Sequence, residues 1–285
     1  MRVDDPHVRT APSDDPSLPI GVFDSGVGGL TVLRAIRSEL PGEALLYLGD
    51  TARVPYGTKS ADSVVRYASQ AAELLVDRGI KLLVVACNTA ASVALGALER
   101  RLAPLPVIGV VEPGARAAVA ASRAQRHLVL ATESTVRQGA YTRAIRALAP
   151  SARVDERACS LFVSLAEEGW TRGAVPDAVA AEYLAPALAA TDGPDCVILG
   201  CTHFPLLLEP IRRAVGPARA IVDSATPTAQ AVRARLDALG LRAPSAGGPG
   251  ALRLLATDGQ ARFARLGAAF LGEPVREVDV ELVDL

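Results

Sequence analysis

Two segments of this chain carry the same succession of residue types: a short apolar run of the β type, a cysteine, and small polar residues that lead into a helical stretch. They read LLVVACNTAAS around Cys87 and CVILGCTHFPLL around Cys201. A comparable offset pairs the apolar segment before Asp24 with the one before Thr132. Because such self-similarity is the sequence signature of a repeated structural unit, the chain is predicted to fold as two related halves.

Short runs of Val, Ile and Leu alternate along the chain with Ala-rich stretches of helical character. This alternation is typical of β-α-β units, in which helices cover both faces of a parallel sheet. With 285 residues, half of them hydrophobic, the chain can bury a substantial core in one large domain or two modest ones. The fold class is therefore predicted to be α/β. Among the predicted elements are strands at 106–111 and 275–280 and one continuous helix over 135–148.

Residues 1–18, MRVDDPHVRTAPSDDPSL, are rich in Asp, Pro and Ser and lack the apolar core of a secretory signal. They are predicted to be a disordered leader on a cytoplasmic protein. No apolar run approaches the roughly 20 residues that span a bilayer, so no membrane segment is expected. The net charge of −1, with both signs interspersed, gives no indication of nucleic-acid binding.

Both cysteines of the repeat follow a predicted strand, as do Asp24 and Thr132. In parallel sheets, ligands collect at the carboxyl ends of strands, where helix N-termini present N–H groups to anions. Two thiols in one cleft suit a reaction in which one thiolate removes a proton from carbon and the opposite thiol returns one to the other face. The helix after each cysteine should lower the pKa of the thiol from its usual value of about 8.5, so both protonation states should be accessible near neutral pH.

Other roles for the cysteines remain open at the level of sequence. Without a secretory signal, the four cysteines are expected to be free thiols. A strand-end cysteine is usually a small buried hydrophobe, and this is what we expect of Cys159 and Cys196. A metal site of Cys87, Cys201 and His203 lacks an evident fourth ligand. A redox pair formed by Cys87 and Cys201, or a non-enzymatic α/β binding module, is a further alternative.

The lysines bear on the choice of cofactor. Many enzymes acidify the α-hydrogen of an amino acid through a pyridoxal phosphate Schiff base on lysine. The chain has only Lys59, in a polar turn, and Lys81, which leads into a buried strand. Neither has a convincing cofactor setting, so we expect no cofactor.

Six longer motifs occur between residue 19 and the C-terminus: FDSGVGGLTVL, GDTARVPYGTKS, ACNTAAS, GVVEPG, GCTHFPLL and LLATDGQARFARLGAAFLG. With them, the chain resembles the glutamate racemases, cofactor-independent enzymes that interconvert L- and D-glutamate. The resemblance implies a cytoplasmic isomerase, often a homodimer, that supplies D-glutamate for peptidoglycan synthesis and so for cell wall biogenesis and cell shape. A racemase of aspartate or a related compound in the same two-cysteine superfamily is the alternative.

On this basis we expect two pseudo-symmetric flavodoxin-like domains whose parallel-type sheets face a central cleft. Domain A would comprise residues 19–114 plus 225–285, and domain B residues 115–224. The chain would thus pass between the domains twice. Two connections of this kind would favour a small hinge closure that excludes water from the substrate.

The resemblance also implies roles for individual residues. Cys87 is expected to deprotonate the D-isomer and Cys201 the L-isomer. Asp24 is expected near Cys87, and His203 and Glu167 near Cys201, as groups that assist the thiols. The expected substrate contacts are Asn88, Thr89 and Thr202 for the α-carboxylate, Asp24 and Ser25 for the ammonium group, and Pro55, Tyr56, Gly57 and Thr132 for the side-chain carboxylate. The chain departs from the common family pattern at Ser160 and Ser164, where proline is frequent.

Overall fold

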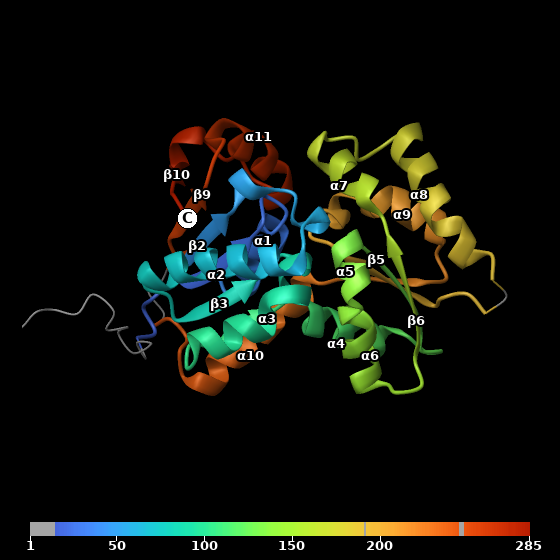
Figure 1. Cartoon of the computed structure of the whole chain (residues 1–285), viewed down its shortest axis with the longest axis horizontal. Helices are drawn as coiled ribbons and strands as arrows, with labels where there is room; N and C mark the ends of the chain where they lie inside the picture. Colours follow the sequence, from blue (N-terminus) through green and yellow to red (C-terminus); the bar gives the residue numbers. More distant parts are fainter. Residues whose placement is uncertain (1–14, 191, 245–247) are drawn as a thin grey trace, which may run out of the picture.

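The chain forms two parallel β-sheets enclosed by helices, side by side (Figure 1). This computed structural model describes residues 15–190, 192–244 and 248–285, so most of the predicted leader lies outside the described residues. Every strand pair in both sheets is parallel. The predicted α/β class with parallel-type sheets is confirmed.

The secondary structure follows the alternation of the sequence. The strands are β1 (Ile20–Asp24), β2 (Leu45–Gly49), β3 (Leu82–Val85), β4 (Val107–Gly109), β5 (Arg126–Ala131), β6 (Arg153–Ala158), β7 (Cys196–Gly200), β8 (Ala220–Asp223), β9 (Leu252–Ala256) and β10 (Val280–Leu282). The α-helices are α1 (Leu30–Glu39), α2 (Ala61–Asp77), α3 (Asn88–Leu102), α4 (Val111–Ala121), α5 (Glu133–Gln138), α6 (Ala140–Leu148), α7 (Ser160–Glu167), α8 (Ala174–Leu188), α9 (Leu208–Val215), α10 (Ala225–Leu239) and α11 (Gln260–Leu271). Short 3-10 helices include η2 (Tyr56–Thr58) and η3 (Phe204–Leu207).

The internal repeat of the sequence reappears in the order of the strands. The first sheet has the order β10-β9-β2-β1-β3-β4 and the second β6-β5-β7-β8, so four strands of the first sheet correspond in order to the four of the second. Cys87 comes after β3 and Cys201 after β7, at equivalent places in the two sheets. Strands β9 and β10 bring the end of the chain back to the first sheet. The exact domain boundaries, at 114/115 and 224/225, stay a prediction.

The central strands are buried along their whole length. Strands β1 (IGVFD), β2 (LLYLG), β3 (LLVV) and β7 (CVILG) are buried at every residue. Continuous apolar strands of this kind are expected where helices cover both faces of a sheet. Strand β6 (RVDERA), at the edge of the second sheet, is instead partly exposed. The buried strands therefore give the residues at their carboxyl ends a rigid base.

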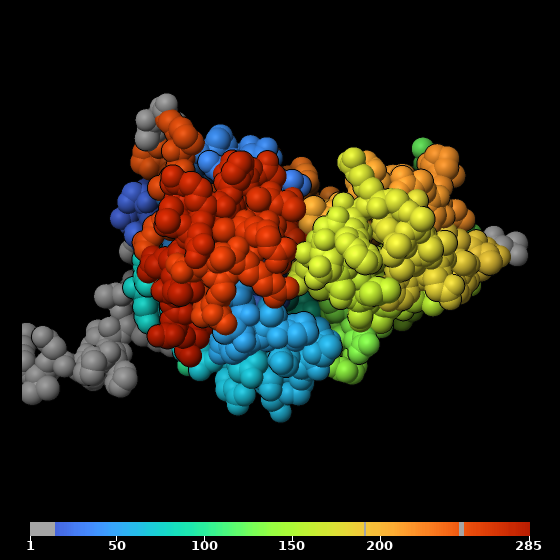
Figure 2. Space-filling view, turned by 90° about the horizontal axis from the view of Figure 1, so that it is seen from above, coloured from blue at the N-terminus to red at the C-terminus, as the bar shows by residue number. Residues whose placement is uncertain are grey.

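Each sheet, with the helices that cover it, forms one unit of the molecule, and contacts between helices connect the two units. Helix α10 packs on α1 and contacts α4, while α4 packs on α6 and on the second sheet, and α3 contacts α5. Figure 2 shows the C-terminal segment, in red, against the segment around α7, in yellow, on the face seen from above. Within the described ranges, no helix combines the length and the apolar character needed to cross a bilayer.

Three predicted elements differ from those observed. The strand expected at 106–111 ends at Gly109 because Val111 already begins α4, whose first turn accommodates Pro113. The helix expected over 135–148 is divided at Gly139, which has a φ of +59° and terminates α5. The last strand is β10 at 280–282, because a 3-10 turn occupies Glu277–Asp279.

Candidate active site

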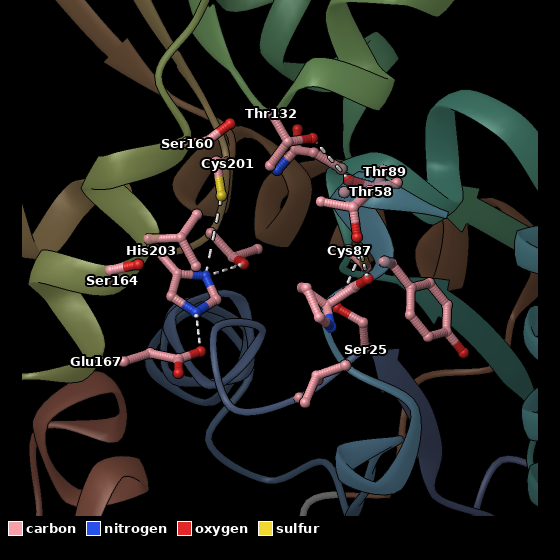
Figure 3. A pocket seen from close by; sticks show the side chains of 18 residues that line it. Ser25, Thr58, Cys87, Thr89, Thr132, Ser160, Ser164, Glu167, Cys201 and His203 are labelled. Carbon is pink, nitrogen blue, oxygen red and sulfur yellow. Dashed lines mark hydrogen bonds and ion pairs between the residues drawn. The ribbon is translucent and has the colours of Figure 1, made fainter. Parts of the chain in front are cut away.

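Residues from both sheets line one cavity of about 240 Å³ (Figure 3). Its walls contain twelve of the thirteen residues predicted for the site: Ser25, Pro55, Tyr56, Gly57, Cys87, Asn88, Thr89, Thr132, Glu167, Cys201, Thr202 and His203. Asp24 does not line the cavity. Gly26, Val54, Thr58, Ser160, Val163 and Ser164 complete the lining. The structure therefore brings the two cysteines of the repeat to one space, and all four cysteines of the chain are free and buried.

Cys87 lies at the N-terminus of α3. Its Sγ accepts a hydrogen bond from the backbone N–H of Ala90 at 3.5 Å, and its thiol donates to Oγ of Ser25 at 3.4 Å. Burial, together with a smaller effect of the nearby Asp24, raises the pKa of Cys87 to about 12. The expectation that the helix would make the Cys87 thiolate accessible near neutral pH is therefore wrong for this structure, because burial outweighs the helix N-terminus. Cys87 is present as a thiol.

Asp24, at the end of β1, is buried behind the cavity wall with 1% of its surface exposed. Its Oδ2 accepts a hydrogen bond from the backbone N–H of Gly26 at 2.8 Å. Burial raises the pKa of Asp24, while the nearby His203 opposes that rise. Asp24 thus contributes to the cavity indirectly, through its hold on the turn at Gly26.

Cys201 has a different local structure from Cys87. It lies in a turn before η3, and the α-helix that follows, α9, begins only at Leu208. A helical stretch therefore follows this cysteine as expected, but its first part is the 3-10 helix that contains Pro205. Its Sγ lies 3.9 Å from Nδ1 of His203.

His203 connects Cys201 to a carboxylate. Its Nε2 lies 3.1 Å from Oε1 of Glu167, and the other oxygen of Glu167 accepts from Nη2 of Arg262 at 2.8 Å (Figure 3 shows the His203 contacts). Burial disfavours a charged His203, but the hydrogen bonds to Cys201 and Glu167 outweigh it and raise the pKa of His203 to about 10. The hydrogen bond from His203 lowers the pKa of Glu167, and Arg262 contributes to the same shift. An imidazolium therefore faces a carboxylate on one side and Cys201 on the other.

Hydroxyl and amide groups crowd the wall between the two units. Oγ1 of Thr89 lies 2.9 Å from Oγ1 of Thr132, which lies 3.1 Å from Oγ1 of Thr135. The hydroxyl of Tyr141, from the second unit, donates to Oδ1 of Asn88 at 2.7 Å. These contacts hold the start of α3 against α5 and α6 of the second unit.

The VPYGT loop contributes its backbone and one ring. The hydroxyl of Tyr56 donates to Oδ2 of Asp50 at 2.5 Å, so it is engaged away from the other site residues. Gly57 lies close to Thr132: a Cβ at this glycine would come within 3.1 Å of the Thr132 Cβ. The loop thus closes one side of the cavity by direct contact with the second unit.

One face of α7 was not recognised as a cavity wall from the sequence alone. Ser160, Val163, Ser164 and Glu167 all line the cavity. They are spaced i, i+3, i+4 and i+7, which places them on one side of a helix. This spacing was available in the sequence and could have identified the face. Within the described part of the chain, no group of three or more His, Cys, Asp or Glu side chains is arranged to hold a metal ion.

Comparison with known proteins adds to this geometry. The family model for Asp/Glu/Hydantoin racemases matches residues 20–232, well over half of the chain. The chain belongs to the Asp/Glu/Hydantoin racemase family. Within this racemase family, it is 49% identical to the glutamate racemase of Geobacter metallireducens over 259 residues, which cover 91% of this chain and 94% of the relative.

Solved racemase structures are similar over almost the whole chain. The crystal structure of a glutamate racemase isoform from Bacillus anthracis has a TM-score of 0.88 at 35% identity and covers 94% of this chain and 98% of that one. The glutamate racemase of Francisella tularensis, crystallised in complex with D-glutamate, has a TM-score of 0.87 at 32% identity with the same coverage. The two-unit α/β fold is thus the fold of these relatives.

Proposed function

We propose that this protein is a glutamate racemase that interconverts L- and D-glutamate through two thiols and without a cofactor. The observation that carries the proposal is that Cys87 and Cys201, at equivalent ends of β3 and β7, line one cavity. The relatives named glutamate racemase support glutamate as the substrate. Two opposed acid/base groups are what inversion at a carbon requires.

The proton transfers follow from the two positions. From L-glutamate, the thiolate of Cys201 takes the α-hydrogen as a proton, and the electron pair of the broken C–H bond stays on the α-carbon. The thiol of Cys87 then donates its proton to the opposite face of that carbon, which forms the new C–H bond of D-glutamate. Cys201 is left as a thiol and Cys87 as a thiolate, the state from which the reverse reaction begins. Proton exchange with solvent restores the first state.

The neighbours of each sulfur support different parts of this cycle. Cys87, whose pKa is about 12, starts as the thiol that donates a proton in the L to D direction. His203 is placed to exchange a proton with Sγ of Cys201 through Nδ1, and Glu167 orients the ring through Nε2. Asp24 holds the turn that carries Ser25 toward Cys87.

The polar lining gives each end of glutamate a partner. Asn88 and Thr89, at the N-terminus of α3, together with Thr202 would bind the α-carboxylate, since helix N-termini favour anions. Ser25, backed by the charge of Asp24, would hold the ammonium group. The side-chain carboxylate would lie against Thr132 and the Pro55–Gly57 loop.

We further propose a cellular role, a location and an assembly for the protein. The D-glutamate would supply peptidoglycan synthesis, in the cytoplasm, with the protein acting as a homodimer. The two domains, residues 19–114 with 225–285 and residues 115–224, would close on the substrate and exclude water from the charged intermediate.

The direct test is to incubate the purified protein with L-glutamate in heavy water, without pyridoxal phosphate, and to follow optical rotation together with α-deuteration. The proposal predicts that rotation decays to zero while deuterium enters the α-position. L-aspartate in a parallel sample should react far more slowly. Unchanged L-glutamate would contradict the proposal, and faster reaction of L-aspartate would move the protein to the alternative substrate.

A further inference from the structure

Helix α11 of the first unit reaches the residues around Cys201 in the second. It follows β9, a strand of the first sheet. Arg262, in its first turn, donates from Nη2 to Oε2 of Glu167 at 2.8 Å. This hydrogen bond crosses the boundary between the two units. In Figure 2 the red C-terminal segment meets the yellow segment that contains α7 on this face.

The contact completes a chain of four side chains. Oε2 of Glu167 accepts from Arg262, Oε1 lies 3.1 Å from Nε2 of His203, and Nδ1 of His203 lies 3.9 Å from Sγ of Cys201. Each carboxylate oxygen thus has one partner, which fixes the rotation of the carboxylate. Without Arg262, Glu167 would have a single partner and could turn away from the ring.

The same helix also packs on the imidazole. The rings of Phe270 and His203 meet edge to face, with centroids 5.0 Å apart. The backbone of Gly28, in the first unit, lies so close that a Cβ there would come within 2.5 Å of Nδ1 of His203. His203 therefore belongs to a loop of the second unit but is oriented by elements of the first.

Arg262 does not line the main cavity. It borders a smaller cavity of about 100 Å³ that shares Gly26, Val54 and Glu167 with the main one. Its side chain is 55% exposed, and an exposed ion pair of this kind adds little to the stability of a fold. We therefore expect Arg262 to affect the orientation of Glu167 rather than the stability of the fold.

We propose that Arg262 is a positioning residue for the Cys201 side of the reaction: it holds Glu167 so that His203 keeps Nδ1 toward Cys201. The inference rests on the proposed function. Because Arg262 and Glu167 belong to different units, the contact forms only when the units are together. The group at Cys201 is thus completed by a side chain from the other unit.

The test uses Arg262→Met and, as a matched control, Arg265→Met one turn along the same helix. Arg265 is exposed and has no ion pair among the described residues. Arg262→Met should lower kcat about tenfold to a hundredfold, the loss typical of a misplaced catalytic group, with little change in KM. Arg262→Lys, which keeps the charge, should recover part of the rate, and Arg265→Met should match the parent.

Primary isotope effects separate positioning from a general structural defect. Slower proton transfer at Cys201 should raise the isotope effect with α-deuterated L-glutamate and lower it with α-deuterated D-glutamate, since Cys87 acts on the D-isomer. In a Glu167→Gln background, Arg262→Met should have almost no further effect, because non-additivity is the mark of residues that act as one unit.

Three results would overturn the inference. They are a parental rate in Arg262→Met, isotope effects that remain unchanged or change together for both isomers, and full additivity with Glu167→Gln. A parent protein that leaves glutamate unchanged would instead refute the proposed function, and this inference with it. A parent that racemises glutamate while Arg262→Met gives one of the three results refutes only the role of Arg262.

Discussion

The two cysteines occupy equivalent ends of equivalent strands, yet their surroundings differ. Cys87 caps a long helix, contacts Ser25 and is buried beside Asp24, which keeps it a thiol. Cys201 lies in a turn before a 3-10 helix and faces His203, which is bound to Glu167. The backbone repeats, but the groups that handle protons do not.

The difference indicates how a duplicated fold can serve an inverting reaction. The repeat of strand order places one sulfur on each unit, so the substrate can lie between two acid/base groups. The two faces of the substrate are not alike, since its carboxylate and ammonium groups must be held in one way while protons move on both sides. Different helpers on the two sides are therefore expected, and the following predictions test this asymmetry.

The largest effect is expected from the two cysteines. Cys87→Ser and Cys201→Ser should each lower kcat for racemisation by about 10³-fold or more, because a serine hydroxyl is a far weaker acid than a thiol and general acid–base groups contribute about 10²–10⁴-fold. Circular dichroism of glutamate measures the rate. Cys159→Ala and Cys196→Ala, at buried cysteines outside the cavity lining, serve as controls and should keep kcat near that of the parent. An active serine variant would show that its thiol is dispensable.

The next effect concerns His203 alone. His203→Gln should lower kcat by about 10²-fold through loss of the proton-exchanging ring. It should also change the dependence of stability on pH. The pKa of His203 is about 10 in the folded protein and about 6.5 when unfolded, so its contribution to stability is full below pH 6.5 and is lost as the pH rises toward 10. Between pH 6.5 and 10 the parent should therefore lose more thermal stability than His203→Gln. Equal losses in the two proteins would argue against a charged His203.

A smaller effect is expected where the first unit touches the Cys201 side. In Gly28→Ala the added methyl would lie 2.3 Å from Oγ1 of Thr202 and 2.5 Å from Nδ1 of His203. Overpacking of this kind costs about 1–3 kcal/mol in the free energy of unfolding, measured by urea denaturation, and should also lower kcat. Gly42→Ala, where no atom lies within 4 Å of the new methyl, is the control. If the two variants behave alike, the close packing on His203 is not required.

The smallest effect is expected at the junction of α3 with the second unit. Tyr141→Phe removes the hydrogen bond to Asn88 and should weaken glutamate binding by about 1 kcal/mol, seen as a several-fold rise in KM with kcat little changed. A drop in kcat with unchanged KM would mean that Asn88 serves the transition state rather than binding.

Much of the fold could be predicted because it depends on short segments of the sequence. The β-α-β alternation, the repeat and the buried strands follow from apolar runs and their spacing. The break at Gly139 and the position of β10 were missed because a left-handed glycine and a 3-10 turn resemble helix and strand in composition. Their geometry depends on single residues.

The site could be predicted less completely, for a physical reason. The site residues were predicted from motifs, and twelve of the thirteen line the cavity. The state of Cys87 depends on burial, which exists only once the sheets are covered. Arg262 and Glu167 are far apart in the sequence, so no local pattern could predict their contact.

The most direct test of the two-thiol account is deuterium exchange by Cys201→Ala with each isomer separately in heavy water, followed by proton NMR and by optical rotation. The account predicts that D-glutamate, the isomer on which Cys87 acts, gains α-deuterium without inversion, while L-glutamate stays unlabelled. Cys87→Ala should give the mirror result. Labelling of L-glutamate by Cys201→Ala, or racemisation by either variant at the parent rate, would contradict the assignment of one thiol to each face.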